Sequence, residues 1–285
     1  MSDASSTIAW RSLLAETESL VGDRQQARWI CERATSSTAD EFRAMLDEPA
    51  AERAVQHLDA MVARARAGEP IQYVLGSWQF RRLDLAVDER VLIPRPETEL
   101  VAGAAIELAA AVGPTRTVLD LGTGSGAIGL AMADELPLTG TSVWLTDAST
   151  DALDVARSNL AGLGRAARNV RVAQGSWFDA VPDDLHFDVI VSNPPYVAVG
   201  SPDVDELVTE WEPRSALFAG VDGLDDLRAI VTRAVDRLLP NGALVVEHGH
   251  DQGPAVQELA RHAGFVEIET RHDLAGHDRY TVARL

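Results

Sequence analysis

Hydrophobic residues recur at helical spacing through the first part of the chain, from Ser5 to about Gly68. The clearest apolar stripe runs at three- and four-residue intervals along one face of a helix that ends near Gly68. The stripe consists of Ala54, Val55, Leu58, Met61 and Val62. Few segments in this region alternate as strands do, so the pattern predicts a small α-helical domain at residues 1–78.

A strand-like alternation follows from Gln79 to Ile93. The apolar positions of its two runs are Leu83, Leu85 and Val87, then Val91 and Ile93. The polar pair Asp88-Glu89 separates the two runs, as a turn would. We therefore expect a β-hairpin linker at residues 79–94.

After Gly113, short β-rich runs alternate with helical patterns such as Asp151–Leu160 and Leu224–Leu239. The predicted strands are Thr117–Leu121, Ser142–Thr146, Val170–Ala173, Asp188–Ser192, Ala243–Glu247, Phe265–Thr270 and Arg279–Ala283. This alternation predicts an α/β domain at residues 95–285 with a mostly parallel sheet covered on both faces. A polar loop separates the last two strands, so we expect them to pair antiparallel at one edge.

The 285 residues include 44 acidic and 25 basic ones, and the net charge is −19 at pH 7. At about 150 residues per domain, the length indicates roughly two domains. The acidic balance disfavours broad binding to nucleic acid or to anionic membranes, because a surface that neutralises phosphates needs a cationic field. Every basic residue is an arginine. Catalysis through a lysine Schiff base or a Walker-type lysine is therefore excluded.

Cysteine and histidine usage narrows the chemistry further. Cys31 is the only cysteine, so no intrachain disulfide and no thiolate zinc cluster can form, which favours a reducing, cytoplasmic location. We see no secretory signal at the N-terminus and no membrane span, because the longest apolar stretch, Val101 to Val112, is interrupted by Glu107. His248 and His250 are spaced i, i+2 with no cysteine nearby, and we expect no metal site there.

The first chemical signal is a glycine loop that directly follows a predicted strand and precedes a helix. Glycines let the backbone turn sharply and let a ligand approach the main chain. Asp147 ends the next strand, where a carboxylate can accept both hydroxyls of a ribose. A tight turn with a solvent-facing Asp is the alternative interpretation. The candidate cofactor residues are Gly122, Thr123, Gly124, Ser125, Gly126 and Asp147.

The spacing of the loop and its first residue indicate which nucleotide it suits. Gly-x-Gly-x-Gly differs from the Gly-x-Gly-x-x-Gly pattern of dinucleotide sites. Asp120, which opens the loop, would repel phosphate and suits a cationic ligand. S-adenosylmethionine carries a ribose, an ammonium group and a sulfonium but no phosphate, so it fits better.

The second signal is Asn193-Pro194-Pro195-Tyr196, directly after a predicted strand and at the sheet edge where open α/β folds place their ligands. Two prolines stiffen the loop and remove two N–H donors. A planar NH₂ group could donate to the Asn193 oxygen and to the Pro194 carbonyl, while Tyr196 stacks on its flat face. We take Asn193, Pro194 and Tyr196 as candidate catalytic residues, and all four residues as candidates for binding substrate.

With these motifs the chain resembles the protein-(glutamine-N(5)) methyltransferases of peptide chain release factors, the HemK/PrmC type. The resemblance runs through nearly the whole chain. Its most specific segments are 68–76, 93–99 (Ile-Pro-Arg-Pro-Glu-Thr-Glu), the glycine loop, 192–196, 212–223 and 247–249. Asn-Pro-Pro-Tyr alone is also compatible with DNA adenine or ribosomal RNA methyltransferases. Segment 93–99 and the helical N-terminal domain narrow the choice.

The resemblance implies a Rossmann-like class I methyltransferase sheet, S-adenosylmethionine as cofactor, and methyl transfer to the glutamine of the Gly-Gly-Gln loop in class-1 release factors. It implies that Gly122 to Gly126 wrap the methionine end of the cofactor, that Asp147 binds the ribose and that Trp177 lies against the adenine. Asn193 would contact both cofactor and substrate. One position departs from the family: Ser176 stands where an acidic residue often precedes the tryptophan.

The resemblance also implies that the helical domain helps to dock a release factor, with neither nucleic acid nor membrane as partner and with the enzyme acting as a monomer. Two alternatives stay open, an amino-methyltransferase acting on adenine in DNA or RNA and a non-catalytic cofactor-binding scaffold. Arg95, Glu97 and Glu99 could either guide the substrate loop or bridge the two domains. The acidic run from Asp203 to Glu212 predicts a solvated loop.

Overall fold

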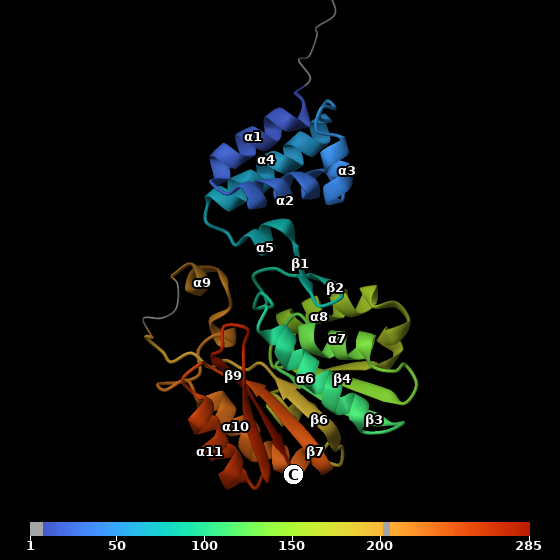
Figure 1. The fold of residues 1–285 in the computed structure, drawn as a ribbon, viewed down its shortest axis with the longest axis vertical. Coiled ribbons are helices and arrows are strands. Elements are labelled where there is room, and N and C mark those ends of the chain that lie inside the picture. Colours follow the sequence, from blue (N-terminus) through green and yellow to red (C-terminus); the bar gives the residue numbers. More distant parts are fainter. Residues whose placement is uncertain (1–7, 202–205) are drawn as a thin grey trace, which may run out of the picture. The chain divides into compact units, whose positions relative to one another are not determined.

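The computed structural model describes residues 8–201 and 206–285 of the chain (Figure 1). The chain divides into two compact units, Met1–Ser77 and Trp78–Leu285, and the described residues of each unit are considered separately. None of the helices in these described parts is long and apolar enough to cross a membrane.

The first unit is helical, as the apolar stripe predicts. Its helices are α1 (Trp10–Val21), α2 (Arg24–Thr35), α3 (Ala39–Ala44), α4 (Glu52–Arg66) and α5 (Ile71–Leu75). Trp10, Phe42 and Leu58 are among the residues buried in its core. A capping box begins α3: the Thr38 hydroxyl accepts from the Glu41 N–H, and the Glu41 carboxylate accepts from the Thr38 N–H. The core and this cap account for the helical fold of the unit.

A hairpin opens the second unit, but it does not lie where the sequence pattern predicts. Its strands are β1 (Ser77–Phe80) and β2 (Leu83–Ala86), so the turn falls at Arg81 and not at Asp88-Glu89. The backbone of Arg81 is left-handed, with φ +52°. Glu99 accepts from the Arg81 N–H at 3.0 Å and Glu135 pairs with its guanidinium, so long-range contacts fix this turn. The prediction of a strand at Val91–Ile93 is wrong.

The second unit is built on a seven-stranded sheet in the order β5-β4-β3-β6-β7-β9-β8. The strands are β3 (Arg116–Leu121), β4 (Thr141–Asp147), β5 (Val170–Gln174), β6 (Phe187–Ser192), β7 (Leu238–Glu247), β8 (Glu267–His272) and β9 (Asp278–Arg284). The first five in the spatial order are parallel, whereas β9 pairs antiparallel with β7 and with β8. Both the mostly parallel α/β sheet and its antiparallel C-terminal edge are confirmed.

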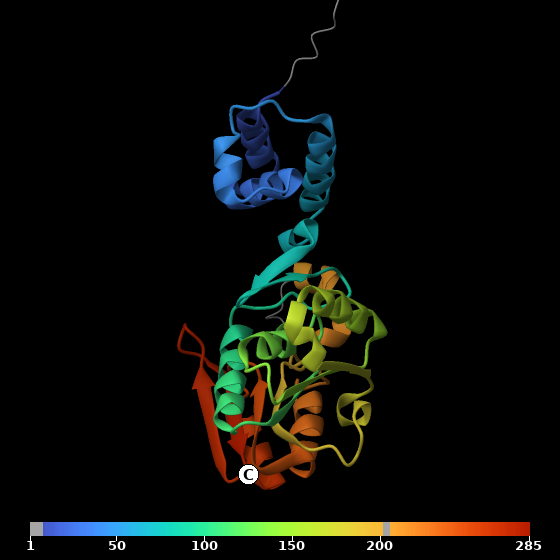
Figure 2. The same ribbon diagram turned by 90° about the vertical axis from the view of Figure 1, so that its right-hand side faces the viewer.

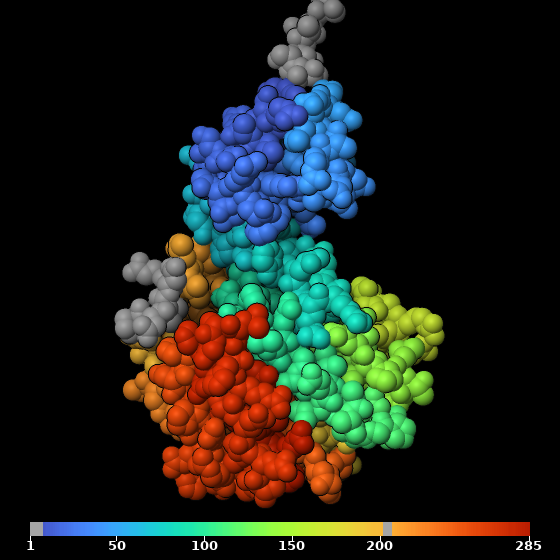
Figure 3. All heavy atoms as spheres, in the orientation of Figure 1, coloured from blue at the N-terminus to red at the C-terminus, as the bar shows by residue number. Residues whose placement is uncertain are grey.

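Helices cover both faces of this sheet (Figures 1 and 2). One face carries α6 (Thr98–Ala111), α7 (Ala127–Glu135) and α8 (Thr150–Gly162), and the other carries α10 (Asp225–Ala234) and α11 (Gly253–Ala263). Adjacent strand residues point to opposite faces, so Val118 packs in the first layer and Leu119 in the second. In Figure 3 the red C-terminal segment lies on the surface beside green residues of the first layer.

Two expected segments differ in extent. The helix expected at Leu224–Leu239 ends at Ala234, a 3₁₀ turn follows at Val235–Arg237, and β7 begins at Leu238. The spacing of Leu238 from the apolar residues before it would also suit a helix. In the structure Leu238 instead pairs with Phe187 of β6, so it belongs to a strand. In the acidic run, residues 203–205 lie outside the described residues and Glu206–Trp211 forms the helix α9.

Candidate active site

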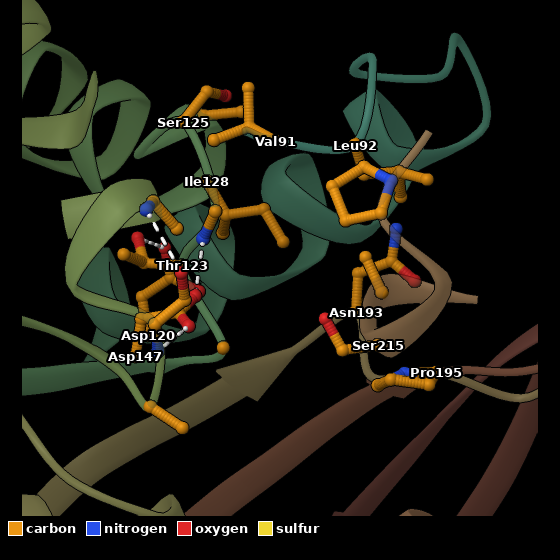
Figure 4. Close-up of a pocket in the computed structure, with 18 of the residues that line it drawn as sticks. Val91, Leu92, Asp120, Thr123, Ser125, Ile128, Asp147, Asn193, Pro195 and Ser215 are labelled. Atoms are coloured by element: carbon orange, nitrogen blue, oxygen red, sulfur yellow. Dashed lines mark hydrogen bonds between the residues drawn. The ribbon is translucent and has the colours of Figure 1, made fainter. Parts of the chain in front are cut away.

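A cavity of about 330 Å³ lies at the carboxyl ends of β3, β4 and β6. The residues singled out in the sequence that line it include Asp120, Gly122, Thr123, Gly124, Ser125, Asp147, Ser176, Trp177, Asn193 and Pro195. Figure 4 shows Asp120, Thr123 and Asp147 close together on one side, with Asn193 and Pro195 on the other. The topology thus brings both sequence signals to one cavity, as expected for ligand sites in open α/β sheets.

The glycine loop adopts backbone conformations that favour glycine. The φ angles of Gly122, Gly124 and Gly126 are +67°, +55° and +88°. A Cβ on Gly122 would lie 3.2 Å from the Trp177 ring, and one on Gly126 would lie 2.8 Å from the Leu130 side chain. Gly126 does not line the cavity, and its lack of a side chain allows Leu130 of α7 to pack closely against it.

Asp120 is buried below this loop. One of its carboxylate oxygens accepts from the Thr123 hydroxyl at 2.6 Å and from the Gly129 N–H at 2.8 Å. Oδ1 is also buried and finds no hydrogen-bond partner among the described residues. Burial raises the pKa of Asp120 to about 6. A buried carboxylate oxygen without a partner, in a residue that lines the cavity, suits a cationic ligand group.

Asp147, at the end of β4, lines the cavity beside the loop. Its carboxylate accepts from the Gly124 N–H at 3.0 Å and from the Ser149 N–H at 2.9 Å. Burial raises the pKa of Asp147, and these backbone hydrogen bonds oppose that rise. The lone pairs that remain can accept from ligand hydroxyls.

Asn193 directly follows β6, and its side-chain amide belongs to a chain of hydrogen bonds. Its Nδ2 donates to the Thr98 hydroxyl at 3.1 Å, and this hydroxyl donates to Glu247 at 2.7 Å. Oδ1 of Asn193 is buried and finds no partner among the described residues. Asn193 therefore offers a buried acceptor at the cavity wall.

Tyr196 and Pro194 do not line the cavity in this structure. The Tyr196 hydroxyl donates to Glu247 at 3.3 Å, and its carbonyl accepts from Gln252 at 2.9 Å. Burial, with the nearby Glu247 charge, raises the pKa of the Tyr196 phenol. These bonds hold the Tyr196 end of the loop, and the bond from Asn193 to Thr98 holds the other end.

Three residues near this site are not among the site residues that the sequence predicts. Thr98 begins α6 and reaches Asn193, as described above. Glu212, expected in a solvated loop, is buried: it accepts from the Ile93 N–H at 3.0 Å and pairs with Arg95 at 2.5 Å. Asp226, at the start of α10, also lines the cavity. The sequence signals for Glu212 are that it closes the acidic run and opens segment 212–223 of the resemblance.

Asp226 lies beside Trp177. Burial raises the pKa of Asp226, and a hydrogen bond from Trp177 opposes that rise. The cavity thus holds an acidic side chain at the tryptophan, although Ser176 precedes that tryptophan in the sequence.

Comparisons with known proteins agree with this geometry. Residues 9–76 match the model of the PrmC N-terminal domain, and residues 102–210 match the model of the methyltransferase small domain. A release factor glutamine methyltransferase of Burkholderia pseudomallei is 40% identical over 266 residues, which is 92% of each chain. The chain belongs to the release factor glutamine methyltransferase family.

Another member of this family, from Vibrio cholerae, is 44% identical over 227 residues, covering 80% of this chain and 77% of the relative. This methyltransferase is thus an enzyme that uses S-adenosylmethionine. Solved structures show the shared fold. A methyltransferase from Pyrococcus furiosus has a TM-score of 0.51 at 19% identity, covering 71% of this chain and 88% of its own. The hMettl16 catalytic domain has a TM-score of 0.54 at 15% identity, covering 81% of each.

Proposed function

We propose that this methyltransferase transfers a methyl group to the side-chain amide nitrogen of the glutamine in the Gly-Gly-Gln loop of class-1 release factors. The observation that carries the proposal is the buried Asn193 oxygen, which lacks a partner at the cavity wall. A primary amide brings two N–H donors that such an acceptor needs. The names of the relatives support a release factor as the substrate.

The residues that line the cavity fit the cofactor. We assign its methionine end to Gly122–Ser125 and Asp120, its ribose to Asp147 and its adenine to Trp177, whereas Gly126, also a candidate cofactor residue in the sequence, does not line the cavity. The unpartnered oxygen of Asp120 suits the ammonium group, and the two oxygens of Asp147 suit the ribose hydroxyls. Asp226 offers the acidic acceptor for the adenine amino group that Ser176 cannot provide. When bound, S-adenosylmethionine supplies a methyl group on a sulfonium that is open to nucleophilic attack.

The loop after β6 makes a poor nucleophile usable. An amide nitrogen reacts weakly because its lone pair is delocalised into the carbonyl. Asn193 Oδ1 and the Pro194 carbonyl accept the two N–H groups of the glutamine, which favours a pyramidal nitrogen with its lone pair directed toward the cofactor side of the cavity. Neither Pro194 nor Tyr196 lines the cavity in this structure, and we assign Tyr196 to the flat face of the amide once substrate is bound. Catalysis is then orientation and electrostatic fit, and no general base is needed before attack because the nitrogen loses its proton to solvent only after it has accepted the methyl group.

The closest rival is an amino-methyltransferase that acts on adenine in nucleic acid with the same Asn-Pro-Pro-Tyr loop. A nucleic-acid enzyme needs a basic surface, and the net charge of −19 weighs against one. The charge favours a protein partner whose docking surface is locally basic. We further propose that the helical unit, residues 1–77, contributes to docking that partner.

The test uses cofactor that carries a labelled methyl group. The enzyme is incubated with a class-1 release factor, with the same factor carrying alanine in place of the glutamine, or with DNA. We expect label on the unaltered factor only. Label on DNA, or equal label on the alanine variant, would overturn the proposal.

A further inference from the structure

Three side chains from distant parts of the sequence form one series of hydrogen bonds that ends at the cavity wall. Glu247 ends β7, Thr98 begins α6 and Asn193 follows β6. The Thr98 hydroxyl lies 2.7 Å from Glu247 Oε2 and 3.1 Å from Asn193 Nδ2. Thr98 is 3% exposed and Glu247 1%, so water does not compete for these bonds.

The direction of each bond in this series follows from the number of protons. An ionised carboxylate can only accept, so the single hydroxyl proton of Thr98 goes to Glu247. The hydroxyl can then only accept from Asn193. This requirement turns the NH₂ group of Asn193 toward Thr98 and leaves Oδ1 as the free acceptor, in agreement with its lack of a partner.

We propose that Thr98 and Glu247 are positioning residues, which fix the Asn193 amide in the one orientation that presents its oxygen to the substrate NH₂ group. The proposal rests on the proposed function, because it assigns that oxygen to the glutamine amide. Without the Thr98 hydroxyl, this orientation would leave the NH₂ group of Asn193 with no acceptor, so the side chain would turn its NH₂ group toward the substrate most of the time. Two NH₂ groups would then face each other, and the substrate would lose an acceptor.

The protonation state of Glu247 controls which groups donate and which accept in this series of hydrogen bonds. A protonated Glu247 can donate to Thr98, and the Thr98 hydroxyl can then donate to Asn193 Oδ1 with the amide turned over. Thr98 and Tyr196 donate to Glu247, Arg279 on β9 stabilises its charge, and Glu97 opposes it. Burial is the largest influence and raises the pKa of Glu247 to about 7. The hydrogen bonds therefore reverse their direction as the pH falls through about 7.

The first experiment compares Thr98→Val with Thr98→Ser. Valine keeps the shape of threonine but has no hydroxyl, whereas serine keeps the hydroxyl. Thr141→Val is the matched control, because this buried hydroxyl donates to the Pro137 carbonyl at the other end of the sheet. Single-turnover rate, KM for the release factor and cofactor affinity are measured for each variant.

We expect Thr98→Val to lower the single-turnover rate roughly 30-fold with cofactor affinity unchanged, and Thr98→Ser to restore most of the rate. Thr141→Val should behave as the wild type. A Thr98→Val rate within twofold of the wild type overturns the proposal, as does an equal loss in Thr98→Ser.

A second readout needs no activity. In ¹⁵N-labelled enzyme, the side-chain NH₂ signal of Asn193 should exchange slowly with solvent in the wild type and Thr98→Ser, and faster in Thr98→Val. Equal exchange in all three overturns the positioning role. If the wild type leaves glutamine unlabelled, the proposed function fails instead, and the exchange data alone decide whether Thr98 fixes the amide.

The pH profile tests the part played by Glu247. The wild-type single-turnover rate should rise as the pH increases through about 7. Glu247→Gln can either donate or accept, so it no longer imposes a direction, and its rate should be lower and flat across this range. A Glu247→Gln profile that rises in parallel with that of the wild type would remove Glu247 from the proposal.

Discussion

The backbone N–H of Gly124 donates to the carboxylate of Asp147 across 3.0 Å, so the glycine loop and the end of β4 hold each other in place. A second backbone donor, the N–H of Ser149, binds the same carboxylate at 2.9 Å. The carboxylate is therefore already oriented before any ligand hydroxyl reaches it. Orientation of this kind lowers the entropic cost of binding.

Replacing Asp147 should weaken cofactor binding. We expect Asp147→Ala to raise the Kd for S-adenosylmethionine at least roughly 30- to 100-fold, because even one hydrogen bond to a charged group contributes about 1.5–3 kcal/mol. Calorimetric titration measures the change. Asp154→Ala, at an exposed position on α8, is the control and should bind like the wild type. Equal affinities of both variants would remove Asp147 from the cofactor site.

Replacing Asn193 should affect the chemical step and leave cofactor binding intact. We expect Asn193→Ala to lower the single-turnover rate on a release factor about 10²- to 10³-fold, as removal of one oriented polar group does in other sites. Cofactor affinity should stay within about twofold. Asn169→Ala, just before β5, is the control. Near-normal turnover in Asn193→Ala with cofactor bound would contradict the mechanism.

Gly122→Ala should lower cofactor affinity through Trp177. A Cβ at this position lies 3.2 Å from the indole ring and must displace it, in addition to the strain of a positive φ. Gly276→Ala has a similar backbone strain, at φ +85°, but meets nothing within 4 Å. Both variants should lose about 1 kcal/mol of stability, and only Gly122→Ala should also bind cofactor more weakly. Thermal melts with and without cofactor separate the two effects.

Stability and activity should respond to pH in opposite directions. The pKa of Glu247 is about 7 in the folded chain against an ordinary value of 4.5, so the folded state binds the extra proton between these values. The stability from this group is therefore full below pH 4.5 and is lost as the pH rises through 7.

Urea unfolding of the wild type and of Glu247→Gln at about pH 5 and pH 8 measures this difference. The wild type should lose on the order of 3 kcal/mol more than the variant over this range. Asp120 titrates in both proteins, so its contribution cancels in the comparison. Identical pH dependence in the two proteins would mean that Glu247 keeps its ordinary pKa.

Association with a release factor should weaken as salt is added. The enzyme carries a net charge of −19, and attraction to a locally basic partner is screened over about 10 Å at 0.1 M salt. We expect the affinity to fall roughly tenfold between 0.05 M and 0.3 M salt. The Kd is measured with the release factor immobilised on a sensor surface. An affinity that does not change over this range would assign the charge to solubility alone.

The sequence predicts the elements that local pattern decides. The central strands β3, β6 and β7 each contain a run of buried apolar residues, and the glycine loop and Asn193–Tyr196 directly follow two of these strands. Because parallel strands place their carboxyl ends at one edge, the meeting of these two motifs could be predicted.

Long-range contacts decide the features that the sequence does not predict. The hairpin turn depends on Glu99 and Glu135 holding Arg81, while Asp88-Glu89 has the more turn-like composition. Thr98 and Glu247 are 149 positions apart in the sequence. A threonine is common at the start of a helix and a glutamate at the end of a strand, so neither residue by itself indicates a functional role. Only the folded sheet shows that they meet.

The position of Glu247 also sets an order of events during synthesis. β7 lies between β6 and β9 in the sheet, yet it is made after the segments that supply the glycine loop, Thr98 and Asn193. The hydrogen bond from Thr98 to Glu247 closes only when β7 is in place. A nascent chain therefore completes the glycine loop and Asp147 before it can form the bond that orients the Asn193 amide.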